Sequence, residues 1–355
     1  MFKQGIHSSG AIAILALALA GSVFAPAHAD DQERRNPPSG LTPDLNDPKN
    51  VGDFDYGVCR GTDPKCYHDW AAGQRVGNKV LIYTRTAGPR HANLGPRLAA
   101  GLNPPLSAGN VVQNALIRWL AAQDIQADWT EDVSWMNSPA RLYPYKAVIF
   151  ASTSRDTLFA HGRAIDPALA VNTTTSAHLD AAKTALRQYM RAGGGFVAIH
   201  NAFGTEYNWP YYEGLLGNAN YYDHGAFQPG TVVTVNSDSS TAGLPERWDF
   251  QDEWYNLVPF PTNVKFLATV DEETLATRRT VHPGHGRFHP VAWCQYYDGG
   301  RAWLTTLGHD ANAFTEGGMP GQAQFQSLIV EGIKSAMGLT PFCVANSGHG
   351  PDRGR

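Results

Sequence analysis

Three histidines in this 355-residue sequence stand just beyond short apolar segments. His200 directly follows an apolar segment that begins after three glycines. His91 and His309 lie a few residues beyond the apolar segments 79–84 and 302–307. If these segments are parallel strands, their carboxyl ends share the sheet edge at which ligands bind in open α/β folds. An imidazole there can ligate a metal, move a proton or bind a polar ligand. His200 would occupy a tight strand-to-loop turn of the kind that holds the nucleophile of α/β-hydrolases.

An acidic pair lies among aromatic residues later in the chain. Asp252 and Glu253 stand between Phe250 and Trp254, where carboxylates need polar partners or water. Metal binding or general acid–base catalysis would use these charges, with Glu253 as the expected active member; a paired surface loop is the alternative. The predicted catalytic residues are His200, Glu253 and His309. The candidate metal ligands are five histidines and one acid: His91, His200, His224, Glu253, His289 and His309. The candidate substrate contacts are Asn201, Trp209, Asp252 and Trp254.

Charge and motif content limit the classes of partner. The net charge is −4 and the sequence contains no basic block, so nucleic acid is not an expected partner. The sequence signatures of zinc fingers, zinc-dependent helices, phosphate loops and dinucleotide sites are absent. His282 and His285 lie in a segment rich in glycine and proline, for which we expect a solvated role.

A predicted α/β sheet positions these residues. Continuous apolar runs are typical of buried parallel strands and occur at 79–84, 147–151 and 196–199, and the segment 125–130 suits a further strand. Apolar residues at helical spacing predict three helices: 110–123 with Asn110 as N-cap, Ser176 or His178 to Ala192, and 323–337. Residues 156–177 are expected to form a loop, with a short helix within it as the alternative. Further strands are predicted at 231–236, 250–255, 264–270, 290–296 and 302–307, the last two as a hairpin. The predicted fold class is therefore an open, mostly parallel α/β sheet flanked by helices, with added antiparallel strands.

The N-terminus has the three parts of a cleavable secretory signal. Lys3 is followed by the apolar run 11–24 and by a small-residue cleavage pattern that ends at Ala29. The apolar run is shorter than the roughly 20 residues that a membrane anchor needs. We therefore expect a signal peptide at 1–29, a secreted or periplasmic mature protein and no membrane span after cleavage. Residues 30–78 are expected to form an irregular arm, 79–338 the main domain, and 339–355 a tail.

The four cysteines are expected to form disulfides, because an exported protein enters an oxidising compartment. Cys59 and Cys66 lie close together in a polar segment and are one candidate pair. Cys294 and Cys343 are the other. Neither pair has the spacing of a metal finger.

Several blocks of the sequence resemble the ThuA-like, or trehalose-utilisation, family. They are, in order, 80–84 with 88–91, 191–200, 252–256, 289–293 and 299–309, with Pro89 where an aromatic residue is expected. The resemblance covers residues 79–337 and implies a flavodoxin-like fold of the class I glutamine amidotransferase type. It also implies an association with the use of trehalose and related sugars. His200 is similar in place to the cysteine of true amidotransferases, and His309 to its partnering histidine. Because the thiol is missing, cysteine-dependent glutaminase chemistry is not expected.

Three functional hypotheses remain. The first is a secreted enzyme that acts on a di- or oligosaccharide or an oxidised sugar through His200, Glu253 and His309. A divalent metal such as zinc suits these ligand types, and a water activated by the metal or by Glu253 would react. The second is a non-catalytic carbohydrate-binding protein whose aromatic residues stack on sugar rings: Trp209, Tyr211, Tyr212 and Trp254. The third is a cysteine- or serine-dependent amidohydrolase, with Cys294 as the candidate thiol.

Overall fold

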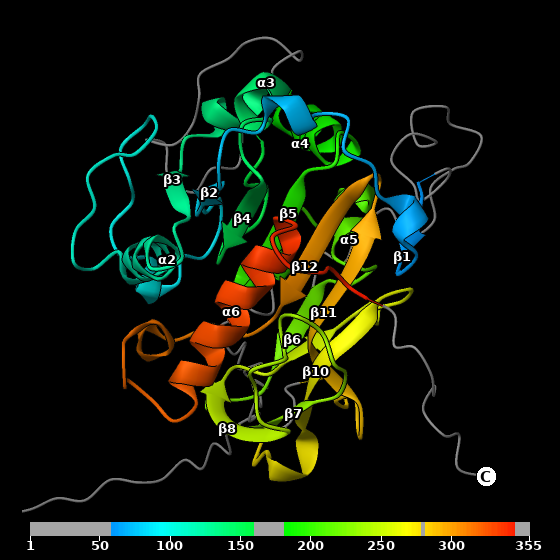
Figure 1. The fold of residues 1–355 in the computed structure, drawn as a ribbon. Helices are drawn as coiled ribbons and strands as arrows, with labels where there is room; N and C mark the ends of the chain where they lie inside the picture. The colour runs from blue at the N-terminus through cyan, green and yellow to red at the C-terminus, as the bar shows by residue number, and fades with distance from the viewer. Residues whose placement is uncertain (1–57, 160–180, 278–280, 345–355) are drawn as a thin grey trace, which may run out of the picture.

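The protein is built on one long, mixed β-sheet (Figure 1). The structure, a computed structural model, describes residues 58–159, 181–277 and 281–344. Five parallel strands form the first half of the sheet, in the spatial order β3 (Gln126–Thr130), β2 (Lys79–Tyr83), β4 (Ala147–Ala151), β5 (Gly195–Ile199) and β12 (Gly300–Thr305). Numbered along the chain, this is the flavodoxin-like order 2-1-3-4-5. The predicted fold class is confirmed.

Antiparallel strands extend the sheet beyond β12. They are β11 (His289–Tyr297), β10 (Lys265–Asp271), β7 (Gln228–Thr234) and β8 (Arg247–Asp252), with the short β1 (Arg60–Gly61) pairing beside β11. The predicted hairpin is present as β11 and β12. The predicted strand 250–255 is wrong as a single element. It is divided between β8 and β9 (Tyr255–Leu257), and β9 pairs with β6 (Tyr221–His224) in a separate two-stranded sheet.

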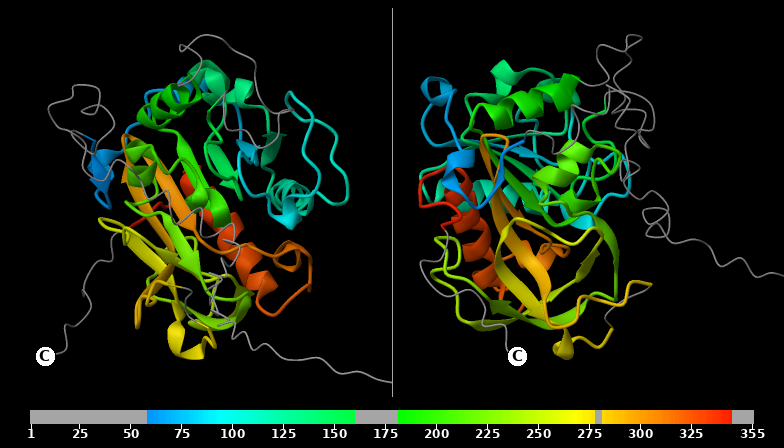
Figure 2. Two further views of the ribbon diagram at one scale, coloured as in Figure 1. Left: turned by 180° about the vertical axis from the view of Figure 1, so that it is seen from behind. Right: turned by 90° about the vertical axis from the view of Figure 1, so that its right-hand side faces the viewer.

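Helices cover both faces of the parallel half, as the two further views show (Figure 2). On one face lie α2 (Val111–Ala121) and α6 (Gln322–Ala336). On the other lie α3 (Pro139–Leu142), α4 (Ala181–Arg191) and α5 (Pro210–Leu215). Successive residues of a strand point to opposite faces, so β2 places Ile82 in one core and Leu81 and Tyr83 in the other. This burial on both faces explains why β2, β4 and β5 are continuous apolar runs in the sequence.

Some local predictions differ from the structure. Asn110 precedes α2 but its side chain does not cap the helix. Its amide instead donates to the carbonyl oxygens of Leu94 and Pro96 at 2.7 and 2.8 Å, which ties the start of α2 to the segment that follows β2. The predicted start of the helix ending at Ala192 and most of the loop 156–177 lie outside the described residues. The short elements α5 and β6 are not among the sequence predictions.

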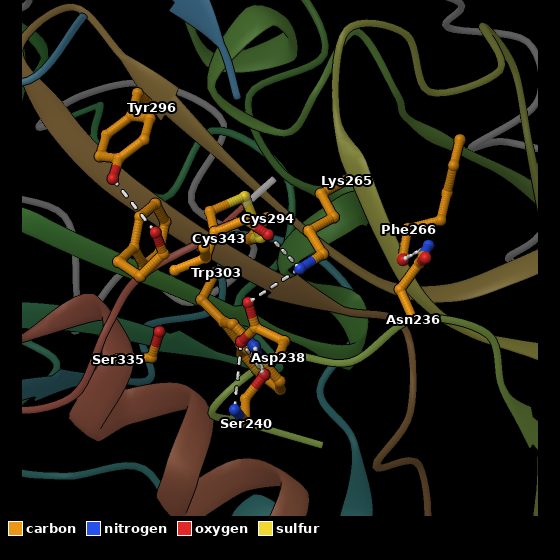
Figure 3. The surroundings of a disulfide bond; sticks show 12 residues. Asn236, Asp238, Ser240, Lys265, Phe266, Cys294, Tyr296, Trp303, Ser335 and Cys343 are labelled. Atoms are coloured by element: carbon orange, nitrogen blue, oxygen red, sulfur yellow. Dashed lines mark hydrogen bonds and ion pairs between the residues drawn. A yellow bond between two sulfur atoms is a disulfide. The ribbon is translucent and has the colours of Figure 1, made fainter. Parts of the chain in front are cut away.

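Disulfides join both cysteine pairs, Cys59–Cys66 and Cys294–Cys343. The second connects β11 to the chain after α6. Figure 3 shows Lys265 beside this bond. Its ammonium lies 3.6 Å from the Asp238 carboxylate and donates to the carbonyl oxygen of Ser237 at 2.6 Å. The predicted signal peptide and the arm up to residue 57 lie outside the described residues. Among the residues that are described, no helix combines the length and apolar character needed to cross a bilayer.

Candidate functional site

His200 occupies the sharp turn at the end of β5. The strand ends at Ile199, and His200 adopts a φ of 53°. This left-handed conformation is uncommon for a residue with a side chain and is maintained only where the surroundings enforce it. The imidazole is fully buried. The tight turn expected at this position is therefore present, and it directs the ring away from the path of the strand.

Hydrogen bonding fixes which nitrogen of His200 carries the proton. Nδ1 lies 3.0 Å from the carbonyl oxygen of Thr306, and because a carbonyl only accepts, Nδ1 must donate. Nε2 therefore presents its lone pair, which accepts from the Tyr255 hydroxyl at 2.9 Å and lies 3.1 Å from Nε2 of His91. Burial, with the positive charges of nearby histidines, lowers the pKa of His200 well below its usual value. A neutral ring with a directed lone pair is the form in which histidine binds metals.

Three more groups converge on this nitrogen. A Glu253 carboxylate oxygen lies 2.9 Å from Nδ1 of His309 and 4.0 Å from Nε2 of His200. The ring of His91 lies 4.7 Å from that of His200 and 5.1 Å from that of His309, centre to centre. One ligand atom from each of His91, His200, Glu253 and His309 lies within 4.8 Å of the others. We call these four residues the histidine–glutamate cluster.

The cluster is assembled from four distant parts of the chain. His91 follows β2 and His309 follows β12, so both lie at the carboxyl edge of the parallel strands, as His200 does. Glu253 comes from the other half of the sheet, at the break between β8 and β9. The pKa of His309 is raised: burial opposes the charged ring, but the hydrogen bond and charge of Glu253 outweigh it.

Asp252 connects the two loops that carry Glu253 and His309. Its fully buried carboxylate accepts from the backbone N–H groups of Gly308 at 2.7 Å, His309 at 3.2 Å and Glu253 at 2.8 Å. Burial raises its pKa to about 7, although these hydrogen bonds oppose the shift. The structure corrects the expectation that Asp252 contacts substrate, since its oxygens are enclosed and engaged. It is a positioning residue.

The two remaining candidate ligands lie outside the cluster. His224, on β6, is adjacent to it, with Nε2 3.4 Å from the Glu253 carboxylate. His289 is fully buried, with Nδ1 2.8 Å from the Glu272 carboxylate and Nε2 2.8 Å from the carbonyl oxygen of Tyr255. The expectation for His289 is therefore corrected: its ring supports β9, whose Tyr255 hydroxyl contacts His200.

The aromatic residues expected to stack on sugar belong to the core. Trp209, Tyr211, Tyr212 and Trp254 are at most 5% exposed. The Trp254 indole donates to the carbonyl oxygen of Gln228 at 3.1 Å. Asn201 is also buried and donates to the carbonyl oxygen of Thr153 at 3.1 Å. These side chains present no polar or aromatic face to a ligand, and the expectation of substrate contact is corrected.

Other polar residues also depart from expectation. His285 is partly buried: its Nε2 accepts from the Leu257 N–H at 2.9 Å, and burial, followed by the charges of neighbouring histidines, lowers its pKa to about 3. Tyr255 is a site residue that the candidate set omits, although the predicted strand 250–255 includes it two residues after Glu253, a spacing that predicts both side chains on one face. Cys294 has no free thiol, because it is bonded to Cys343. The cysteine-dependent hypothesis is therefore wrong for this residue.

Comparisons with known proteins find one family model and several solved structures that are similar to this chain. The family model that matches is ThuA, described as trehalose utilisation, over residues 79–336. A ThuA-like protein from Bacteroides uniformis is similar in structure with a TM-score of 0.50 at 20% identity, covering 72% of this chain and 91% of that one. A ThuA-like protein from Parabacteroides merdae has a TM-score of 0.49 at 17% identity, covering 75% and 91%.

The similarity to the Bacteroides uniformis protein, at 20% identity, bears on the fold alone. No curated protein matches the sequence. The family-model match is the stronger finding, because it spans well over half of the chain and includes all four residues of the histidine–glutamate cluster. On that match, this chain belongs to the ThuA family of trehalose utilisation.

Proposed function

We propose that this protein is an exported, metal-assisted enzyme that acts on a trehalose-related or oxidised sugar at the histidine–glutamate cluster. The family's description supports the sugar class. The convergence of four ligand atoms within 4.8 Å is the observation that carries the proposal. The start of the chain, with its basic, apolar and small-residue segments, supports export.

The donor set fits a zinc ion. Three imidazoles and one carboxylate are ligand types that zinc and related transition ions prefer. His200 is oriented by a backbone carbonyl on its other nitrogen, an outer contact that is usual for metal-binding histidines. The cluster is also accessible at its outer side, since the His309 side chain is 28% exposed.

The chain's own residues then have separate tasks. His91, His200, Glu253 and His309 would hold the ion, which supplies Lewis-acid polarisation of a sugar oxygen. His224 lies 3.4 Å from Glu253 with its side chain 14% exposed, so it can exchange a proton with a bound sugar hydroxyl. Tyr255 holds the inner side of the site through its contact with His200. Asp252 fixes the two loops on which Glu253 and His309 lie.

Metal analysis and zinc titration test the proposal. We expect the purified protein to bind one zinc ion per chain by isothermal titration calorimetry, and we expect His200→Ala to lower the affinity at least tenfold. His282→Ala is the matched control, because His282 lies outside the cluster and the variant should bind zinc normally. Equal zinc affinity in wild type and His200→Ala would contradict the metal site. Turnover of trehalose or an oxidised sugar by metal-free protein would remove the metal from the mechanism.

The non-catalytic carbohydrate-binding hypothesis loses its main support in the structure. It requires exposed aromatic rings at the site, and the four rings expected to stack are buried. It predicts sugar binding that survives His200→Ala without any product, whereas the enzyme hypothesis predicts product from wild type and none from His200→Ala.

A further inference from the structure

A cavity of about 460 Å³ opens on the antiparallel half of the molecule, away from the histidine–glutamate cluster. Its walls come from β7, β8, β10 and the segment before β11: Val233, Val235, Arg247, Thr269, Val270, Asp271, Glu272, Glu273, Gly286, Arg287 and Phe288. No residue of the cluster lines it. Its volume lies within the roughly 300–1,000 Å³ of small-molecule sites.

The cavity has apolar walls. Val233 and Val235 contribute aliphatic surface from β7 and the residue just beyond it. Phe288 is 40% exposed and its ring packs against Phe266, with centres 4.9 Å apart. An exposed ring supported from behind is a rigid surface on which the C–H face of a sugar ring can pack, because apolar contact there removes water from both partners.

The polar groups of the cavity carry both signs of charge. Arg247 and Asp271 form an ion pair at 2.5 Å with 49% and 27% of their side chains exposed, and Arg287 and Glu273 add one charge of each sign. A planar guanidinium beside a carboxylate offers paired donors and acceptors, which match the adjacent hydroxyls of a polyol. Glu272 is a third acid in the lining, but its carboxylate is hydrogen-bonded to His289 and to the N–H of His285. The other charges are two of each sign, which favours a neutral ligand over an anion or a cation.

Glu272 is a fixed part of the cavity wall. Its carboxylate is hydrogen-bonded to Nδ1 of His289 at 2.8 Å and to the backbone N–H of His285. These hydrogen bonds hold its pKa below the usual value although burial opposes them. The acid therefore stays ionised and fixed in the wall, and the cavity is formed before any ligand arrives.

We propose that this cavity is a non-catalytic binding pocket for a neutral carbohydrate unit, with Phe288 as the stacking surface and Arg247 and Asp271 as the hydroxyl-binding pair. The proposal goes beyond the reaction proposed for the histidine–glutamate cluster and does not depend on it. Such a pocket would hold one sugar unit of a substrate or retain the protein near a carbohydrate source.

Trehalose and maltose, titrated by calorimetry into His200→Ala protein, test the pocket separately from the cluster. We expect His200→Ala to bind at least one of the two sugars. Adding Phe288→Ala or Arg247→Gln should weaken that binding at least tenfold. Adding Trp70→Ala should leave it unchanged, because Trp70 is an aromatic residue that is 71% exposed and lies outside the cavity.

Three results would overturn the pocket: no sugar binding by His200→Ala, no effect of either cavity substitution, or an equal loss with Trp70→Ala. Arg247→Gln is a surface change that keeps the fold, so the test does not rest on Phe288→Ala alone. Zinc titration of the Phe288→Ala variant separates the two proposals. A failed pocket leaves zinc binding at the cluster untouched, and a failed metal site leaves the sugar affinity of the pocket unchanged.

Discussion

Asp252 is the buried acid on which two of the four candidate ligands depend. Each of its oxygens accepts from the backbone, so it holds the loops of Glu253 and His309 in register. A site built from separate loops needs such support, because small displacements of ligands weaken metal binding. At the residue scale, the geometry of the site depends as much on this acceptor as on the side chains that face the ion.

We expect Asp252→Asn to weaken zinc binding about tenfold or more. In the variant, the NH₂ group replaces one carboxylate oxygen and points at a backbone N–H that donates to that oxygen in the wild type. Two donors then face each other without an acceptor, which lowers the free energy of unfolding by about 1–3 kcal/mol. Zinc calorimetry and urea unfolding measure the two effects. Asp249→Asn on the exposed side of the same strand is the control. Unchanged zinc affinity in Asp252→Asn would mean that the loops hold their positions without it.

The strands differ in how clearly they can be predicted. Those buried on both faces, such as β2 and β5, are continuous apolar runs with predicted limits within a residue or two of the observed ones. The break between β8 and β9 has no such signal, because Trp254 is as apolar as a strand residue. The chain leaves the sheet there because Asp252 turns to bind the N–H groups beyond β12, a contact between segments far apart in the sequence.

Strands β2 and β3 are linked at their edge by Asp128. Its carboxylate lies 2.6 Å from the Lys79 ammonium and accepts from Tyr145 and Asn103 at 2.7 Å each. Burial opposes the charge, but these contacts outweigh it and lower the pKa of Asp128 below its usual value. A carboxyl whose pKa is lower in the folded state stabilises the fold above its unfolded pKa, and this stabilisation is lost as the pH falls through the folded value.

Asp128→Asn should therefore lower the free energy of unfolding by about 1 kcal/mol at pH 7. The difference from wild type should shrink below the ordinary aspartate pKa of 3.8 as wild-type Asp128 protonates. Urea unfolding at a series of pH values measures this. A difference that stays constant from pH 7 to pH 2.5 would show that the amide disturbs packing rather than charge.

At the scale of the whole molecule, one disulfide attaches the chain after α6 to β11, and the other closes a short loop near the start of the described chain. Cys294–Cys343 closes a loop with a sequence separation of 49, and Cys59–Cys66 one with a separation of 7. A longer loop loses more freedom in the unfolded chain when it is closed, so the first bond should stabilise the protein more.

Replacing Cys294 and Cys343 together by alanine should lower the free energy of unfolding by about 4 kcal/mol, and replacing Cys59 and Cys66 by about 2 kcal/mol. Guanidinium unfolding without reductant compares the two double variants. The reverse order would show that contacts of the chain around Cys59 and Cys66, rather than loop closure, dominate.

The sequence alone determined the strands of the parallel half of the sheet, its longer flanking helices and the edge at which three histidines meet. It could do so because strands that are buried on both faces, such as β2 and β5, are continuous apolar runs whose ends can be predicted. The family resemblance came from the same blocks of sequence.

Only the tertiary structure decided which candidates belong to the site. In the folded protein, Glu253 from the antiparallel half of the sheet lies beside the three histidines, and His289 is hydrogen-bonded to β9. The tryptophans that were expected to contact a sugar are buried. Those outcomes depend on strand register and on contacts between segments more than a hundred residues apart, such as His200 with Thr306. The type of a residue determines which interactions its side chain can make. The residues with which it makes them depend on which distant segments of the chain pack together.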